Sequence, residues 1–346
     1  MKSKIESILI NEKNIPQGLE VPTRIRSFSE IQTGVYSTIQ RLTKKYPGAK
    51  IYYSHENPIF INSFLSRNSF IRLYENQKID LEIQPQGFLP WELIRQISKQ
   101  IEEDIDLSKD IKKWNRKLKI KSEQFSVVGK KKHLYLHPTA NVYPNVVFDL
   151  TSGPIIIDKG VTITSFSFLE GPLYISPNAQ IDGARITGGT IIGDTCKIGG
   201  EVENSIFGNF SNKHHEGFVG HSFISSWVNL GALSTTSDLK NNYGTIKIWS
   251  GLEKINTGTI KFGSIIGDFS KIAIGCMLNT GSVIDIGCNV VAPRVEGYTK
   301  PFSWVGGSEK YRLDSFLNDA KKIMARRDKS LSEKEEILLR NLYEIF

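Results

Sequence analysis

Aliphatic side chains recur at every sixth position in two long stretches of this chain. The stretches comprise Ile157, Ile163, Leu169, Ile175 and Ile181, and then Ile266, Ile272, Leu278, Ile284 and Val290. A period of six fits neither an α-helix nor a single alternating strand. It is typical of a solenoid in which each short strand sends one aliphatic side chain inward, and stacked coils bury a continuous column. Three such strands would complete one triangular coil.

Turn-forming residues lie between the hexad positions, as in Asp158-Lys159-Gly160 and Pro177-Asn178-Ala179. Asn, Asp and Gly tolerate the backbone conformations that the corners of such a coil need. The spacing slips after Ile181, and it disappears between Thr236 and Gly263 before it returns in register. Lost register indicates a loop that projects from a corner, which is where solenoids carry function.

The segments on either side of the hexads predict a division of the chain into four parts. We expect a reduced α/β domain with a linker helix over 1–118, a basic connector over 119–132, a β-helix over 133–300 and a helical extension over 301–346. The extension has an apolar stripe that begins at Leu313, and a capping box of Ser332 with Glu335. We interpret its helices as a cap over the open end of the solenoid, with a contact to a neighbouring subunit as the alternative.

Within the first part, helical spacing of apolar residues predicts a helix over Glu30–Tyr46, which Pro47-Gly48 would stop. Short strands are expected at Lys50–Tyr53 and Ile59–Ile61. A charged helix would run from Leu89 to about Leu118.

The composition is that of an ordinary soluble protein, with 346 residues of which 39% are hydrophobic and 23% charged. No run approaches the roughly 18 apolar residues that a membrane span requires, and the N-terminus predicts no signal peptide. The three cysteines have no close pairing, which favours buried thiols in a reducing cytoplasm over a zinc site.

Positive charge is concentrated before the hexads. Residues 99–132 hold eleven Lys/Arg and six Asp/Glu, against a net charge of +8 for the whole chain. This run is either a solvated helix or a surface that attracts phosphate-bearing molecules. Without interleaved aromatic residues or a nucleic-acid motif, we expect no nucleic-acid partner.

The densest polar cluster of the hexad region is Asn209–His221, NFSNKHHEGFVGH, which holds three of the six histidines. It is either a surface loop with incidental histidines, a metal site or the site of a general base. Adjacent histidines on extended backbone point to opposite faces, so His214 and His215 fit one metal poorly. A neutral imidazole that titrates near pH 6.5 can take a proton from an attacking amine or hydroxyl.

Several motifs around this cluster resemble a known enzyme family. They are the run from Gly200-Glu201-Val202-Glu203 to His215-Glu216-Gly217-Phe218-Val219-Gly220, then Trp227-Val228-Asn229-Leu230-Gly231-Ala232, the run Asn241-Asn242-Tyr243-Gly244 with Lys247 and Trp249, and Phe302-Ser303-Trp304. The chain is similar over roughly 130–346 to the acetyltransferase half of the bifunctional bacterial glucosamine-1-phosphate N-acetyltransferase/N-acetylglucosamine-1-phosphate uridylyltransferase family. It resembles a divergent, shorter branch of that family more closely.

The resemblance implies a left-handed parallel β-helix, a homotrimer with active sites between subunits, and acetyl-CoA as the co-substrate. It matches His215 to the catalytic base and Glu201 to the acidic residue that orients this base. Asn229 matches a sugar contact, Ala232 lies where backbone groups meet acetyl-CoA, and Arg185 corresponds to an arginine that binds phosphate. A carboxylate on one imidazole nitrogen would fix the tautomer and leave the other lone pair for the substrate.

The sequence also departs from the family's pattern around this site. Glu203 stands where the family has a phosphate-binding lysine, and Phe218 stands where it has a sugar-contacting tyrosine. Asp238 and Leu239 replace an Asn-Tyr pair near the acetyl group. Lys213 and Lys240 could supply compensating charge to the substrate, although a role as ordinary solvated lysines is favoured for both.

In the family, the N-terminal half is a sugar-phosphate nucleotidyltransferase with a Gly-rich nucleotide loop and acidic residues that hold Mg²⁺. No Gly-rich loop followed by Arg or Lys stands in residues 1–90 of this chain, and only Thr23–Arg26 and Gly34-Val35 faintly resemble the divergent branch. We therefore interpret this part as a shortened relic, for which Mg²⁺ matters only if nucleotidyl transfer is retained.

Three functional hypotheses follow from these observations. The first is a cytoplasmic acyl-CoA-dependent acetyltransferase that acts on an amino sugar or a sugar phosphate, with His215 as the base. The second is a sugar-1-phosphate nucleotidyltransferase in which the β-helix only assembles the oligomer. The third is a non-catalytic scaffold that binds a sugar nucleotide.

Overall fold

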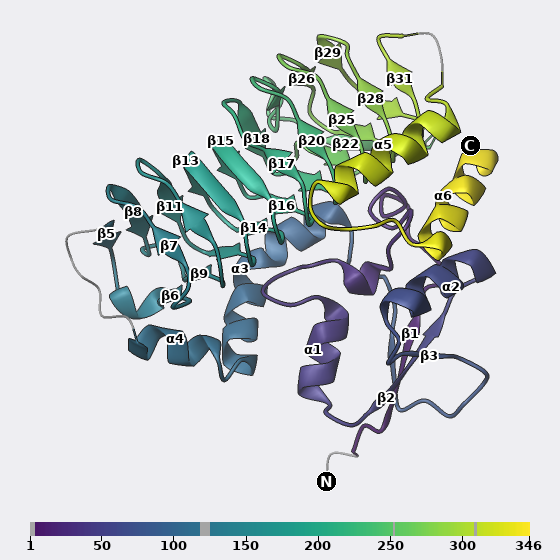
Figure 1. Cartoon of the computed structure of the whole chain (residues 1–346), viewed down its shortest axis with the longest axis horizontal. Coiled ribbons are helices and arrows are strands. Elements are labelled where there is room, and N and C mark those ends of the chain that lie inside the picture. Colours follow the sequence, from purple (N-terminus) through teal and green to yellow (C-terminus); the bar gives the residue numbers. More distant parts are fainter. Residues whose placement is uncertain (1–3, 118–124, 252, 308–309) are drawn as a thin grey trace.

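A parallel β-helix dominates the computed structural model, which describes residues 4–117, 125–251, 253–307 and 310–346 (Figure 1). Its short strands pair in parallel from coil to coil and build three faces. The first face holds β7 (Asn141–Val142), β10 (Thr162–Ile163), the start of β13 (Gln180–Thr187), the start of β15 (Lys197–Glu203), β17 (Asn212–Lys213), β20 (Asn229–Leu230), β25 (Lys271–Ile272), β28 (Asn289–Val290) and β31 (Trp304–Val305).

The other two faces follow the same order along the chain. The second face holds β5 (Phe125–Val128), β8 (Val146–Asp149), β11 (Phe168–Glu170), the ends of β13 and β15, β18 (Phe218–Gly220), β21 (Thr235–Thr236), β26 (Met277–Leu278) and β29 (Arg294–Val295). The third face holds β6 (Leu134–Leu136), β9 (Ile155–Ile157), β12 (Leu173–Ile175), β14 (Thr190–Ile192), β16 (Ile206–Phe207), β19 (Phe223–Ile224), β24 (Ser264–Ile266), β27 (Ser282–Ile284) and β30 (Tyr298–Thr299).

The register of these strands aligns the predicted hexad positions inside the coils. Ile163 pairs with Ile181, and Ile181 with Ile198; two coils further on, Leu230 pairs with Ile272. All of these side chains are buried in one aliphatic column. The parallel β-helix predicted from the spacing is therefore confirmed, while its left-handed sense remains an expectation from the resemblance.

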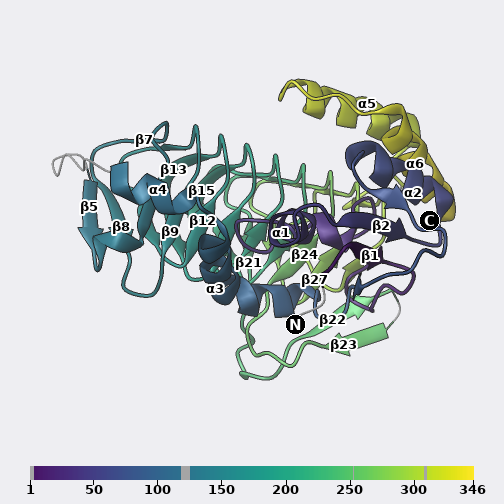
Figure 2. The same ribbon diagram turned by 90° about the horizontal axis from the view of Figure 1, so that it is seen from below.

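Both irregularities in the hexad spacing have a structural cause. The slip after Ile181 coincides with a register shift between Asp182 and Arg185, where β13 pairs with β15. The gap after Thr236 is an excursion that carries the antiparallel hairpin of β22 (Lys247–Ser250) and β23 (Glu253–Asn256). Figure 2 shows this hairpin projecting away from the coils, as the lost register predicted.

The third face is apolar on its outer side as well as its inner side. Its outward residues join one hydrophobic core with the N-terminal α/β region and the C-terminal helices, and they are Ile156, Tyr174, Ile191, Ile206, Phe223, Ile265 and Val283. A strand that is buried on both sides becomes a continuous apolar run, as in Ile155–Ile157. The α/β region therefore shares its core with the β-helix.

The α/β region is built on a parallel sheet with strand order β3-β2-β1-β4. Its elements are β1 (Ser7–Asn11), η1 (Phe28–Glu30), α1 (Thr38–Lys45), β2 (Lys50–Ser54), α2 (Pro58–Arg67), β3 (Arg72–Leu73), β4 (Leu81–Ile83), α3 (Pro90–Leu107) and α4 (Ile111–Lys117). The strand predicted at Lys50–Tyr53 is confirmed as β2.

Three other predictions for this region need correction. Ile59–Ile61 is not a strand but the first turns of α2, because the Asn57 side chain caps the helix and Pro58 occupies its first turn. The helix predicted over Glu30–Tyr46 begins only at Thr38, since Ser37 forms a capping box there. The single helix from Leu89 is two helices, and α3 ends before Ser108.

The β-helix extends beyond its predicted bounds at both ends. Phe125–Val128 already forms strand β5 of the second face, ahead of the expected start at residue 133, and Trp304–Val305 adds β31 after residue 300. The predicted connector 119–132 thus overlaps the first coil, which also includes the short helix η2 (Lys131–His133). Its residues 119–124 lie outside the described part of the chain.

The extension forms two helices, as predicted, at α5 (Leu313–Ala325) and α6 (Glu333–Ile345). They lie along the side of the coils and do not close an open end (Figure 1). Phe316 of α5 packs edge-on against Phe302, whereas Arg327 beyond its end donates to Asn212 Oδ1 at 3.0 Å in a coil far from Phe302 in sequence. Helix α6 packs against α2. The predicted end cap is therefore corrected to a lateral brace.

Two buried ion pairs fasten the N-terminal segment to the β-helix. Arg24 approaches Asp285 through Nε at 3.1 Å and Nη2 at 2.8 Å, and Arg26 Nε lies 3.1 Å from Asp268 Oδ1. Both aspartate side chains are completely buried. Buried carboxylates need such partners, because the desolvation of an unpaired charge is costly.

Arg24→Met is expected to destabilise the protein, because among the described residues it leaves the buried Asp285 carboxylate only its bonds from Tyr298 and the Ile286 amide. We expect a loss of about 3 kcal/mol in the free energy of unfolding, measured by urea denaturation. Adding Asp285→Asn should recover a large part of the loss. Arg340→Met removes an arginine from an exposed pair with Glu336, so a cost under about 1 kcal/mol is expected for this control. Equal costs for the two single variants would contradict this interpretation.

Lys213 interrupts the aliphatic column. Its register partner is Ile198, and its side chain is fully buried at a position where the neighbouring coils carry aliphatic residues. The ammonium donates to the carbonyl of His215. Burial lowers the pKa of Lys213 to about 8, although the charge of Glu216 acts in the opposite direction. A cation inside an apolar column costs free energy, since desolvation disfavours the charged form.

Lys213→Met is therefore expected to raise the free energy of unfolding at pH 7 by about 2 kcal/mol. The folded protein binds fewer protons than the unfolded chain between the lowered pKa near 8 and the ordinary value near 10.5. Wild-type stability should rise with pH across that window, and the advantage of Met should shrink there. Denaturation curves from pH 6 to 10.5 measure both trends; a constant difference at all pH values would show that the charge is not the cause.

Candidate functional site

His215 lies on an exposed loop at the first corner, which we define as the turn between the first and second faces. Residues 214–217 form this loop between β17 and β18. The loop stacks closely on the coils on either side: the Glu201 amide donates to the Gly217 carbonyl at 3.0 Å, and the Leu233 amide donates to the Glu216 carbonyl at 2.7 Å. The buried ammonium of Lys213 holds the His215 carbonyl from inside. The backbone of this loop is thus fixed from three directions.

The predicted pair of Glu201 and His215 does not form within the chain. Glu201 pairs instead with Arg185, whose Nη1 lies 3.1 Å from Oε1, because the two residues are register partners in β15 and β13. The Arg185 side chain is exposed, and the Glu201 side chain is partly exposed. Among the described residues, no hydrogen bond reaches the imidazole nitrogens of His215. The carboxylate predicted to orient this base is therefore engaged elsewhere.

His214, the neighbour of His215, does have a carboxylate partner. Its Nε2 pairs with Asp182 Oδ2 from two coils below, across Gly199, and its ring lies 5.0 Å from the ring of His215. The two adjacent imidazoles thus differ in their environment: one is tied to an acid, and the other faces solvent.

Two further predicted site residues, Asn229 and Ala232, lie close to the first corner. A third, Lys213, does not face outward. Asn229 is exposed on the first face, two residues before the corner, and Ala232 lies in the corner loop of the coil above His215. Lys213 was expected to contribute charge to a substrate, and this prediction is wrong for a physical reason. The hexad places it inside the coil, where its ammonium meets the His215 carbonyl.

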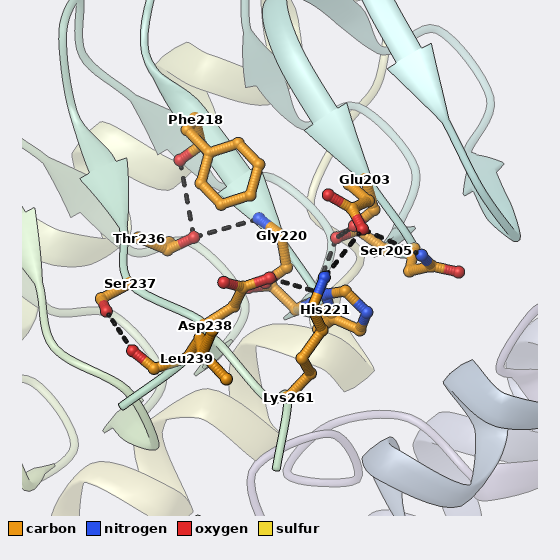
Figure 3. Close-up of polar contacts among 12 residues, drawn as sticks. Glu203, Ser205, Phe218, Gly220, His221, Thr236, Ser237, Asp238, Leu239 and Lys261 are labelled. Atoms are coloured by element: carbon orange, nitrogen blue, oxygen red, sulfur yellow. Dashed lines mark hydrogen bonds and ion pairs between the residues drawn. The ribbon is translucent and has the colours of Figure 1, made fainter. Parts of the chain in front are cut away.

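A second polar cluster lies at the second corner, between the second and third faces (Figure 3). His221 Nδ1 lies 2.7 Å from Asp238 Oδ2, and both side chains are mostly buried. Burial of Asp238 acts to raise the pKa of its carboxyl, but the hydrogen bond and charge of His221 outweigh it and lower that pKa. Lys261 Nζ pairs with Glu203 beside them at 3.3 Å. Asp238 thus belongs to this cluster and is separated from His215 by the width of the second face.

The His221–Asp238 pair is the carboxylate-oriented imidazole that sequence reasoning missed. The two residues are separated by 17 positions. Seventeen residues is also the spacing of the register partners Val202 and Val219, so it amounts to one coil. The spacing was available in the sequence, because any two residues one coil apart lie side by side.

No group of three or more His, Cys, Asp or Glu side chains suited to a metal ion occurs among the described residues. The cysteines are free and buried, as predicted, and burial raises the pKa of Cys196 and of Cys288 to about 12. Within the described part of the chain, no helix has the length and apolar character that crossing a membrane requires.

The α/β region fills the edge of its own sheet where such folds bind ligands. Ligands of parallel sheets lie beyond the carboxyl ends of the strands. Here Glu12 follows β1, and its carboxylate accepts from Tyr53 Oη at 2.6 Å and from the Phe28 amide at 2.9 Å. Burial raises the pKa of Glu12 to about 7. Phe28 is completely buried and its amide meets Glu12, so this residue occupies part of the region beyond the strand ends.

Comparison with known proteins adds little to this geometry. No protein-family model and no curated protein sequence matches the chain. Among solved structures, it is similar to the acetyltransferase domain of PglB from Neisseria gonorrhoeae in complex with acetyl coenzyme A, with 12% identity over 86% of this chain and 98% of that one and a TM-score of 0.18. It is also similar to PerB from Caulobacter crescentus in complex with CoA and GDP-perosamine, with 13% identity over 84% of this chain and 91% of that one and a TM-score of 0.19. Both TM-scores are too low for either likeness to bear on the fold or the activity of this chain.

Proposed function

We propose that this protein is an acetyl-CoA-dependent acetyltransferase that acts on an amino sugar or a sugar phosphate. The motif resemblance over roughly 130–346 supports the reaction class. The expected homotrimer, its cytoplasmic location and an acetyl-CoA site near Ala232 are parts of the same proposal. Arg185 and Asn229, which lie on either side of the first corner, are proposed to contact the acceptor.

The observation that carries the proposal is the exposure of the His215 ring on a loop whose backbone is held in place. His215 has an exposed imidazole, free of hydrogen bonds to its ring among the described residues, on a loop whose backbone is held by the coils above and below. A general base needs an accessible lone pair in a fixed place. His215 offers an accessible ring on a fixed backbone, whereas each of the other two histidines of the cluster has one ring nitrogen on a carboxylate.

In the proposed reaction, the acceptor nitrogen attacks the thioester carbonyl of acetyl-CoA. A C–N bond forms, the C–S bond breaks, and CoA leaves as the thiol. His215 takes the proton that the amine loses, and it can return that proton to the departing sulfur. A backbone N–H at the first corner would stabilise the negative charge that develops on the carbonyl oxygen.

His215→Ala is expected to lower kcat for acetyl transfer by about 100-fold or more, because general-base assistance contributes that much. The measurement is release of CoA thiol over a panel of amino sugars and amino sugar phosphates, with the full chain. Thermal unfolding should be unchanged, since no described contact depends on the His215 ring beyond its proximity to His214.

His214→Ala and His221→Ala are the matched controls. Each removes an imidazole from the same cluster, and each should leave more than a tenth of the activity. A full loss in His221→Ala with activity retained in His215→Ala would move the base to the His221–Asp238 pair. Absence of thiol release from every acceptor, with Mg²⁺-dependent pyrophosphate release from a nucleotide and a sugar 1-phosphate, would replace the proposal with nucleotidyl transfer.

A further inference from the structure

A cleft rich in lysine lies where the excursion meets the next two coils. It has a volume of about 690 Å³ and is lined by four lysines, Lys240, Lys247, Lys254 and Lys300. The hairpin of β22 and β23 forms one wall, and the second corner of the following coils, at Asn279 and Glu296, forms the other. This volume is within the usual range of small-molecule sites.

The charge of this cleft is not neutralised by the protein. Among the described residues, none of the four ammonium groups has a carboxylate partner within ion-pair distance. Lys240 Nζ donates to the Thr245 carbonyl at 2.9 Å, and Lys254 Nζ lies 4.6 Å from the centre of the Trp249 ring. The one acidic residue of the lining, Glu296, accepts from Asn279 at 2.8 Å. Four like charges are thus held around one hollow.

By contrast, another lysine near this corner has a carboxylate partner. Lys261, at the base of the same excursion, is paired with Glu203 at 3.3 Å, and the isolated bridge of Lys261 with Leu239 fixes it there. Clustered cations repel one another, so a cleft of this kind favours an anionic ligand. Trp249 and Tyr298 add aromatic surface to the same walls.

We propose that this lysine cleft binds the phosphate groups of a nucleotide. The ligand would place its phosphates among Lys240, Lys247 and Lys300 and its base against the aromatic wall, where rings stack on Trp side chains. Two sources share this chemistry: the adenosine bisphosphate end of an acyl-CoA, and a free or sugar-linked nucleoside diphosphate. The acyl-CoA source rests on the proposed acetyl transfer, whereas the binding of nucleotide phosphates in the cleft does not.

Titration calorimetry on the full chain tests the cleft, with adenosine 3′,5′-bisphosphate and UDP as probes and adenosine as the phosphate-free control. We expect at least one nucleotide to bind, adenosine to bind at least 30-fold more weakly, and the affinity to fall as salt is raised. The nucleotide that binds more tightly identifies the source.

The double variant Lys247→Glu with Lys300→Glu should weaken that binding at least 30-fold. Both side chains are exposed and, within the described residues, without an ion-pair partner, so folding should be unaffected. Lys261→Glu is the matched control, because it reverses one nearby charge outside the lining, and a change under threefold is expected. If charge reversal prevents folding, the double variant Lys247→Met with Lys300→Met is used instead. It should lower the affinity for the nucleotide at least tenfold. The proposal is overturned if neither nucleotide binds, or if the double variant binds as tightly as the wild type.

Discussion

Parallel hydrogen bonding between successive coils is the constraint on which the rest of this structure depends. Once one strand pairs in register with the strand below it, each residue of a coil lies over its equivalent in the next. Ile163, Ile181 and Ile198 therefore share one inward position, and the corners also stack in columns. Side chains that look remote in sequence become neighbours when one coil separates them. The pairs of His221 with Asp238 and of Arg185 with Glu201 arise in this way.

The same constraint explains why both histidine clusters flank one face. The second face begins at the first corner, with His215, and ends at the second corner, with His221 and Asp238. Arg185, Glu201 and Phe218 lie in register across it. Polar chemistry is thus confined to the rims and the exterior of a frame whose interior is aliphatic. Lys213 is a charged residue inside the coils, and it holds the backbone beside His215.

The sequence predicted the β-helix well because inward positions favour apolar side chains, and these side chains recur at a regular spacing along the chain. It predicted side-chain partners less well, because partners depend on the exact coil length. Glu201 was assigned to His215 from a resemblance, but the register brings Arg185 beside it. His221 and Asp238 could have been paired from their separation of 17 residues. Ile59–Ile61 was wrong because the Asn57 cap and Pro58 outweigh the strand propensity of three residues.

The pairs of Arg24 with Asp285 and Arg26 with Asp268 limit how this protein can be divided. Cutting the chain ahead of β5 would expose the apolar outer side of the third face and would leave two aspartates without their counter-charges. An exchange of N-terminal regions between related chains would therefore succeed only if the incoming segment carried both arginines, or if both aspartates changed with it. The β-helix of this protein is in that sense a component of a larger folding unit and not a module that recombination can transfer alone.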